Sequence, residues 1–141
     1  MATQNETTRT ARARPVLLAL VLAAALPGMA AAEELVREFR GERSTETAEF
    51  EVDAPWLIDW RVNSEYTESM GFDVELVSAP MGNHAGRVVK TRQRGSGLRL
   101  VNESGRFRFK VESALAYWTI RVVQLTPEEA AAYAPKGAES P

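Results

Sequence analysis

Cationic side chains are the most prominent residues in this sequence that could do chemistry. Apolar and basic residues alternate over residues 104–122, and the basic ones are Arg106, Arg108, Lys110 and Arg121. A guanidinium group binds a carboxylate or a phosphate through two parallel hydrogen bonds, so arginines gathered on one surface suit an anionic ligand. The chain as a whole has a net charge of −2. A basic surface within an acidic protein therefore needs a physical reason.

The charge is unevenly distributed along the chain. Residues 33–86 hold 13 acidic and 4 basic residues, whereas residues 87–110 hold 8 basic residues and only Glu103 as an acidic one. Such asymmetry indicates either a binding surface for an anionic partner or two segments that neutralise each other in the folded protein.

Catalytic and metal-binding residues form no motif. His84, in "MGNHAG", is the only histidine, and the chain has no cysteine. A zinc site needs several convergent ligands, and a Ser-His-Asp triad needs a structured base, so a loop histidine without identified partners is expected to be neither. A calcium site from Asp53, Asp59 and Asp73 would lack a loop motif. We therefore expect no enzyme activity, no cofactor and no metal.

Residues 1–32 have the layout of a secretory signal peptide. Three arginines precede an unbroken apolar run of 11 residues, Val16 to Leu26, and small residues follow up to Ala32. The run is too short for a membrane span, which needs about 20 residues. Cleavage after Ala30 and a buried N-terminal helix are the alternatives. We expect a bacterial periplasmic or secreted protein with no lipid anchor, because cysteine is absent, and no membrane span after cleavage.

Most of the remaining chain alternates with a period of two, which is typical of half-buried β-strands. The expected strands cover residues 35–43, 46–53, 56–62, 72–76, 87–94, 98–101, 106–113 and 117–125. Many short strands without intervening helices predict an all-β fold, an antiparallel β-sandwich of about eight strands with jelly-roll or immunoglobulin-like topology. The sandwich domain would span residues 33–125.

A short helix is expected after the last strand. Thr126-Pro127-Glu128-Glu129 is a capping box with proline at the first helical position. Residues 126–141 are therefore expected to form a short helix and a flexible tail.

Two stretches carry a resemblance to known proteins. They are "F-x-V-x-x-P-W-x-I-x-W", from Phe50 to Trp60, and "S-G-x-F-x-F-x-V-x-S…W-x-I-x-V-x-Q", from Ser104 to Gln124. This pattern of aromatic residues and turn glycines resembles small extracytoplasmic β-sandwich domains of uncharacterised secreted bacterial proteins. It is also loosely similar to β-sandwich domains appended to secreted peptidases. The resemblance implies the fold and brings no catalytic motif onto this sequence.

Aromatic residues suggest sugar binding only weakly. Trp56, Trp60 and Trp118 share the parity of neighbouring aliphatic residues, so all three are expected in the core. Tyr66 and Tyr117 are better placed to be exposed, but they are expected to be scattered and not to form a sugar-binding surface.

Tight turns between the last four expected strands would pair each strand with the one that follows it in the chain, which gives three antiparallel pairings. On this register, arginines from four strands form a single row: Arg92, Arg99, Arg108 and Arg121. The row is flanked by Lys90, Arg94, Arg106 and Lys110. Like charges directly opposite each other in a sheet destabilise it by up to about 1 kcal/mol per pair. The predicted row therefore requires an explanation.

Two explanations stay open. The simpler one is internal: residues 46–53 lie beside the sheet, with Glu49, Glu51 and Glu112 between the cations, or the arginine stems cover apolar surface. The functional one is an anion-binding site formed by the row with Lys90 and Lys110. Its ligand would be an acidic polysaccharide, a lipid phosphate or an acidic protein surface, and not nucleic acid, since the exported domain is acidic.

We expect a non-enzymatic exported binding or accessory module. The alternative is a structural or interaction subunit of an envelope protein assembly, which adds a strand from a partner through an edge strand at residues 35–43.

Overall fold

The computed structural model describes residues 33–134, so the expected signal peptide and the end of the expected tail lie outside the described residues. The described chain forms β1 (Glu34–Gly41), β2 (Thr45–Glu46), β3 (Phe50–Val52), β4 (Trp56–Asn63), β5 (Gly71–Ser78), β6 (His84–Thr91), β7 (Gly95–Val101), β8 (Gly105–Ala114), β9 (Tyr117–Gln124) and α1 (Pro127–Tyr133). Within residues 33–134, no helix has the length and apolar character to cross a membrane.

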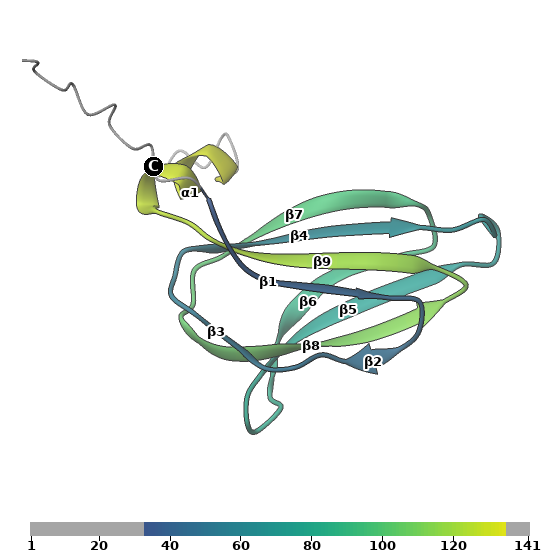
Figure 1. Cartoon of the computed structure of the whole chain (residues 1–141), viewed down its shortest axis with the longest axis horizontal. Helices are drawn as coiled ribbons and strands as arrows, with labels where there is room; N and C mark the ends of the chain where they lie inside the picture. Colours follow the sequence, from purple (N-terminus) through teal and green to yellow (C-terminus); the bar gives the residue numbers. More distant parts are fainter. Residues whose placement is uncertain (1–32, 135–141) are drawn as a thin grey trace, which may run out of the picture.

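The strands form two antiparallel sheets that face each other as a β-sandwich (Figure 1). Sheet A has the order β1-β9-β4-β7, and sheet B has the order β2-β8-β5-β6, with β3 also paired to β8. Because β2 and β3 both pair with β8, they are two parts of one interrupted strand. Every connection except β5–β6 then crosses between the sheets, which is the jelly-roll arrangement. The predicted all-β antiparallel sandwich with a short C-terminal helix is confirmed.

The core lies between the sheets and collects one face of each central strand. Its most buried side chains, each at most 2 % exposed, include Trp56, Ile58, Phe72, Val74, Phe109, Ile120 and Val122. Trp118 is also buried, and Trp60 is half-buried against the same cluster. Alternation of apolar and polar residues therefore placed the three tryptophans correctly, with Trp60 at the margin of the core.

Two glycines make room for tryptophans at the edges of sheet A. Gly41 on β1 is the register partner of Trp118, and Gly97 on β7 is the partner of Trp60. A Cβ atom added at either glycine would lie 2.6 Å from an indole carbon. Any larger residue would push the indole or the edge strand out of place.

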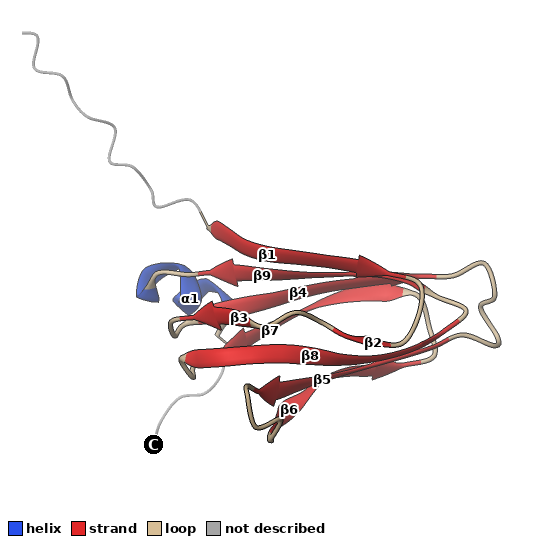
Figure 2. Cartoon of the chain, turned by 60° about the horizontal axis from the view of Figure 1, so that its bottom comes forward, coloured by secondary structure: helices blue, strands red, loops and turns tan. Residues whose placement is uncertain are grey.

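The helix α1 covers one end of the outer face of sheet A (Figure 2). Its capping box forms as expected: the Thr126 hydroxyl accepts a hydrogen bond from the Glu129 amide, and the Glu129 carboxylate accepts one from the Thr126 amide. Ala130 packs with Leu57 and Val123 in a second small apolar cluster. The helix therefore stabilises only the apolar end of this face.

The predicted register of the last four strands is wrong. In the structure β7 pairs with β4, and β8 pairs with β5 and the short strands β2 and β3. A tight hairpin and a crossing between two sheets both keep alternate residues in the core, so the alternation that revealed the strands could not distinguish the two. The turn at residues 79–83 joins the only two consecutive described strands that form a hairpin, β5 and β6.

Candidate anion-binding face

The predicted row of arginines does not form, because its members belong to different sheets. Arg99 and Arg121 lie on β7 and β9 of sheet A, Arg108 lies on β8 of sheet B, and Arg92 follows the end of β6. Even within sheet A the two arginines point to opposite sides: Arg99 is the register partner of the buried residue Ile58, whereas Arg121 is opposite Asp59.

Basic residues on sheet B are matched by carboxylates. Arg108 Nε lies 3.5 Å from a Glu46 oxygen, and Arg108 Nη1 lies 3.8 Å from a Glu49 oxygen. The guanidinium of Arg106 lies 3.9 Å from carboxylate oxygens of both Glu49 and Glu51. The acidic segment around β2 and β3 thus lies beside β8, which is the arrangement that the internal explanation of the basic residues required.

A second group of ion pairs joins β5 and β6. The guanidinium of Arg87 lies 3.4 Å from both Asp73 and Glu75, and Lys90 Nζ lies 4.0 Å from Asp73. Lys110, on β8, lies in register with Glu75 on one side and a β2 glutamate on the other. We call the cations Arg87, Lys90, Arg106 and Arg108 with their carboxylates the paired face. There, four cations contact five carboxylates: Glu46, Glu49, Glu51, Asp73 and Glu75.

Arg99 has a structural role at the open side of the sandwich. It lies on β7, the edge strand of sheet A, and donates a hydrogen bond to the backbone carbonyl of Arg87 on β6, the edge strand of sheet B. Gly86 leaves the space that this side chain needs, because a Cβ there would lie 3.1 Å from a guanidinium nitrogen of Arg99. Arg99 therefore links the two sheets.

Lys90 and Arg92 come together in a different place from the other predicted site residues. Both line an open hollow of about 590 Å³ at one end of sheet B. Asp73 and Glu112 line the same hollow, so two carboxylates accompany its two cations. The charges of this hollow therefore balance, and it offers an anion no excess of positive charge.

Three further cations occupy the outer face of sheet A beyond α1. We call Arg40, Arg61 and Arg121 the arginine face. In one row across the sheet, Arg121 lies between Glu38 and Asp59. In the next row, Thr119 on β9 lies between Arg40 on β1 and Arg61 on β4.

The three cations of the arginine face contact only two carboxylates. Arg40 Nη2 lies 2.9 Å from Glu38, but Arg61 and Arg121 share a single oxygen of Asp59, each at 3.9 Å. Glu42 also lines the first hollow, but the ion pairs of Arg61 and Arg121 both end on Asp59, so these two guanidinium groups share one carboxylate. The side chains of Arg40 and Arg61 are 74 % and 69 % exposed, so an incoming ligand can reach them.

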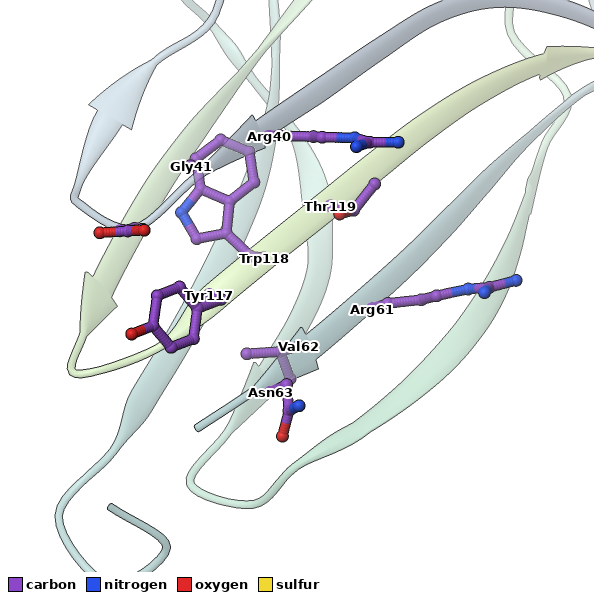
Figure 3. Close-up of a pocket in the computed structure, with 9 residues that line it drawn as sticks. Arg40, Gly41, Arg61, Val62, Asn63, Tyr117, Trp118 and Thr119 are labelled. Atoms are coloured by element: carbon purple, nitrogen blue, oxygen red, sulfur yellow. The ribbon is translucent and has the colours of Figure 1, made fainter. Parts of the chain in front are cut away.

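Two adjoining hollows lie along this face, with volumes of about 440 and 390 Å³. Both are lined by Arg40, Arg61 and Thr119. Figure 3 shows the two arginines extending in the same direction on either side of Thr119. A planar anionic group above Thr119 would therefore have a guanidinium on each side of it.

Residues 33–134 contain no cluster of three or more histidine, cysteine, aspartate or glutamate side chains suited to hold a metal ion. His84 is exposed, and its imidazole Nδ1 lies 4.0 Å from Glu75. No known protein family matches the chain, and no curated protein is similar to it.

Of the six predicted site residues, only Arg121 belongs to the arginine face. Arg40 and Arg61 were missed, although the alternation of β4 already placed Arg61 on the outer side with Asp59. The missing information was that β9 pairs with both β1 and β4, which are distant from it in the sequence. Sequence reasoning paired β9 with β8 instead.

Proposed function

We propose that this protein is an exported, non-enzymatic binding or accessory module that holds an anionic ligand of the bacterial envelope on its arginine face. The leader-like residues 1–32 and the resemblance to small extracytoplasmic β-sandwich domains support the location. Two guanidinium groups that share one carboxylate on the outer face of sheet A support the ligand class.

The observation that carries the proposal is the sharing of Asp59 by two guanidinium groups. One carboxylate neutralises one cation, so Arg61 and Arg121 together attract a further negative charge. Arginine suits this task because its planar fork binds carboxylate and phosphate groups in a bidentate manner. The hollows lined by Arg40, Arg61 and Thr119 leave room for an extended ligand along this face.

The test compares two double variants. R61Q/R121Q removes two cations from the arginine face, and R106Q/R108Q removes two from the paired face as the matched control. Binding of each protein to polygalacturonate, inorganic polyphosphate and phosphatidylglycerol vesicles would be measured between about 0.05 and about 0.5 M NaCl, because exposed charges are screened over this range.

We expect the parent protein to bind at least one of these polyanions at low salt and to release it as salt rises. R61Q/R121Q should weaken this binding about tenfold or more, and R106Q/R108Q should leave it within about twofold of the parent. No binding by the parent, or equal losses in the two variants, would refute the proposal.

A second candidate function is strand addition by a protein partner. The strand β1 is an edge strand of sheet A, as the alternative interpretation of the sequence requires. However, β1 has an irregular register between Leu35 and Arg37 and carries Glu34, Glu38 and Arg40. Bulges and charged side chains are the features with which edge strands resist pairing. Comigration with an envelope protein at high salt would favour this candidate over the first.

A further inference from the structure

The hollows of the arginine face continue beyond the end of sheet A. A third hollow, of about 220 Å³, adjoins them through Glu42 and Tyr117. Tyr66 and Leu115 also line this third hollow. Outward residues at every second position of β9 therefore lead from Arg121 past Thr119 to Tyr117, a distance of about 13 Å at about 3.3 Å per residue.

Exposed apolar side chains gather at this end of the path. Tyr66, Leu115 and Tyr117 are 59 %, 53 % and 52 % exposed. The expectation that Tyr66 and Tyr117 are scattered is wrong, since both line the third hollow. They come from segments that are about 50 residues apart in the sequence, so only the fold could reveal that they meet.

The loops that carry these side chains are held together by a buried polar residue. Ser64, 3 % exposed, is the only buried polar or charged residue among residues 33–134. Its hydroxyl donates a hydrogen bond to the Leu115 carbonyl and accepts one from the Tyr66 amide at 2.9 Å. The amides of Ser69 and Met70 donate to the Tyr66 carbonyl. These hydrogen bonds therefore join the backbones of the two loops that border the third hollow.

The backbone of Leu115, at the border of the third hollow, has an unusual conformation. Its φ angle is +52°, a left-handed conformation that a bulky residue adopts only when the surrounding structure holds it there. The hydrogen bond from the Ser64 hydroxyl fixes the Leu115 carbonyl in this turn. A glycine would relieve the strain, so an exposed leucine at this position is unexplained by folding alone.

We propose that the anionic ligand is an acidic polysaccharide, whose carboxylates bind the arginine face while a neighbouring sugar ring packs on Tyr117 and Tyr66. This inference rests on the proposed function and adds the class of ligand. A phosphate group alone would use only the guanidiniums. A pyranose ring presents an apolar C–H face to an aromatic ring and hydroxyls to the Asn63 and Thr119 side chains, both of which line the first hollow.

The experiment separates the aromatic contribution from the ionic one. Y66A/Y117A removes both rings from exposed positions, and M81A is the matched control, because Met81 is 81 % exposed in the β5–β6 turn of the other sheet. Affinities for polygalacturonate and inorganic polyphosphate would be measured by calorimetry at low salt. Far-ultraviolet circular dichroism would confirm that each variant keeps its strands.

We expect Y66A/Y117A to weaken polygalacturonate binding about tenfold and to leave polyphosphate binding unchanged, since only a sugar uses the rings. M81A should change neither affinity. Equal affinities of Y66A/Y117A and the parent for polygalacturonate would overturn the polysaccharide inference. If polyphosphate binding still depended on Arg61 and Arg121, the proposed function would stand; if the parent bound neither polymer, both proposals would fail.

Discussion

The outer faces of the two sheets use arginine in different ways. On the paired face of sheet B, four cations contact five carboxylates, and the acidic segment of β2 and β3 supplies three of these. On the arginine face of sheet A, three cations contact two carboxylates. Basic residues on the first face are thus part of the fold, whereas those on the second retain an attraction for negative charge.

Gly41, which lies beneath the arginine face, should tolerate substitution less well than Gly71 on sheet B. In G41A, the new Cβ would lie 2.6 Å from the Trp118 indole and displace β1 from β9, which moves Arg40 relative to Arg61. We expect a loss of about 1–3 kcal/mol in the free energy of unfolding, measured with urea, and weaker polyanion binding. G71A on sheet B is the control, because nothing lies within 4 Å of its added Cβ; similar losses in both variants would contradict this view.

Removing cations should affect stability on the paired face more than on the arginine face. R106Q/R108Q removes the guanidinium groups that contact Glu46, Glu49 and Glu51, and the Arg108 side chain is only 22 % exposed. We expect this variant to lose about 1–2 kcal/mol in urea unfolding, and R61Q/R121Q to change by less than about 0.5 kcal/mol. High salt should reduce the difference, since it screens these exposed pairs. A larger loss of stability in R61Q/R121Q than in R106Q/R108Q would contradict this difference between the two faces.

The smallest effect concerns the boundary between α1 and the arginine face. The Tyr133 hydroxyl donates a hydrogen bond to the Glu33 carboxylate, and this bond raises the pKa of Tyr133 above its ordinary value. Because the folded-state pKa is raised, the contribution of this contact to stability is present below the ordinary tyrosine pKa and is lost as pH rises through the raised pKa. Absorbance titration should show one late-titrating tyrosine, which E33Q returns toward the ordinary pKa.

Features that depend on neighbouring residues in the chain could be predicted from the sequence. Alternation placed Trp56 and Ile58 in the core, and the capping box at Thr126 gave the start of α1. The arginine row failed because it needed strand order, which depends on pairings between segments far apart in the chain. The arginine face depends on β9 lying between β1 and β4, and the hydrogen bonds of Ser64 depend on two loops that meet only in three dimensions.

The carboxylate of Asp59 offers the most direct test of the central claim. Its side chain is 15 % exposed and is shared by Arg61 and Arg121. D59N keeps the shape of the side chain and removes its charge, so polygalacturonate should bind about three- to tenfold more tightly at low salt. E75Q on the paired face should leave the affinity unchanged. An affinity of D59N equal to or below that of the parent protein would contradict the claim that this face binds anions through the two arginines that share Asp59.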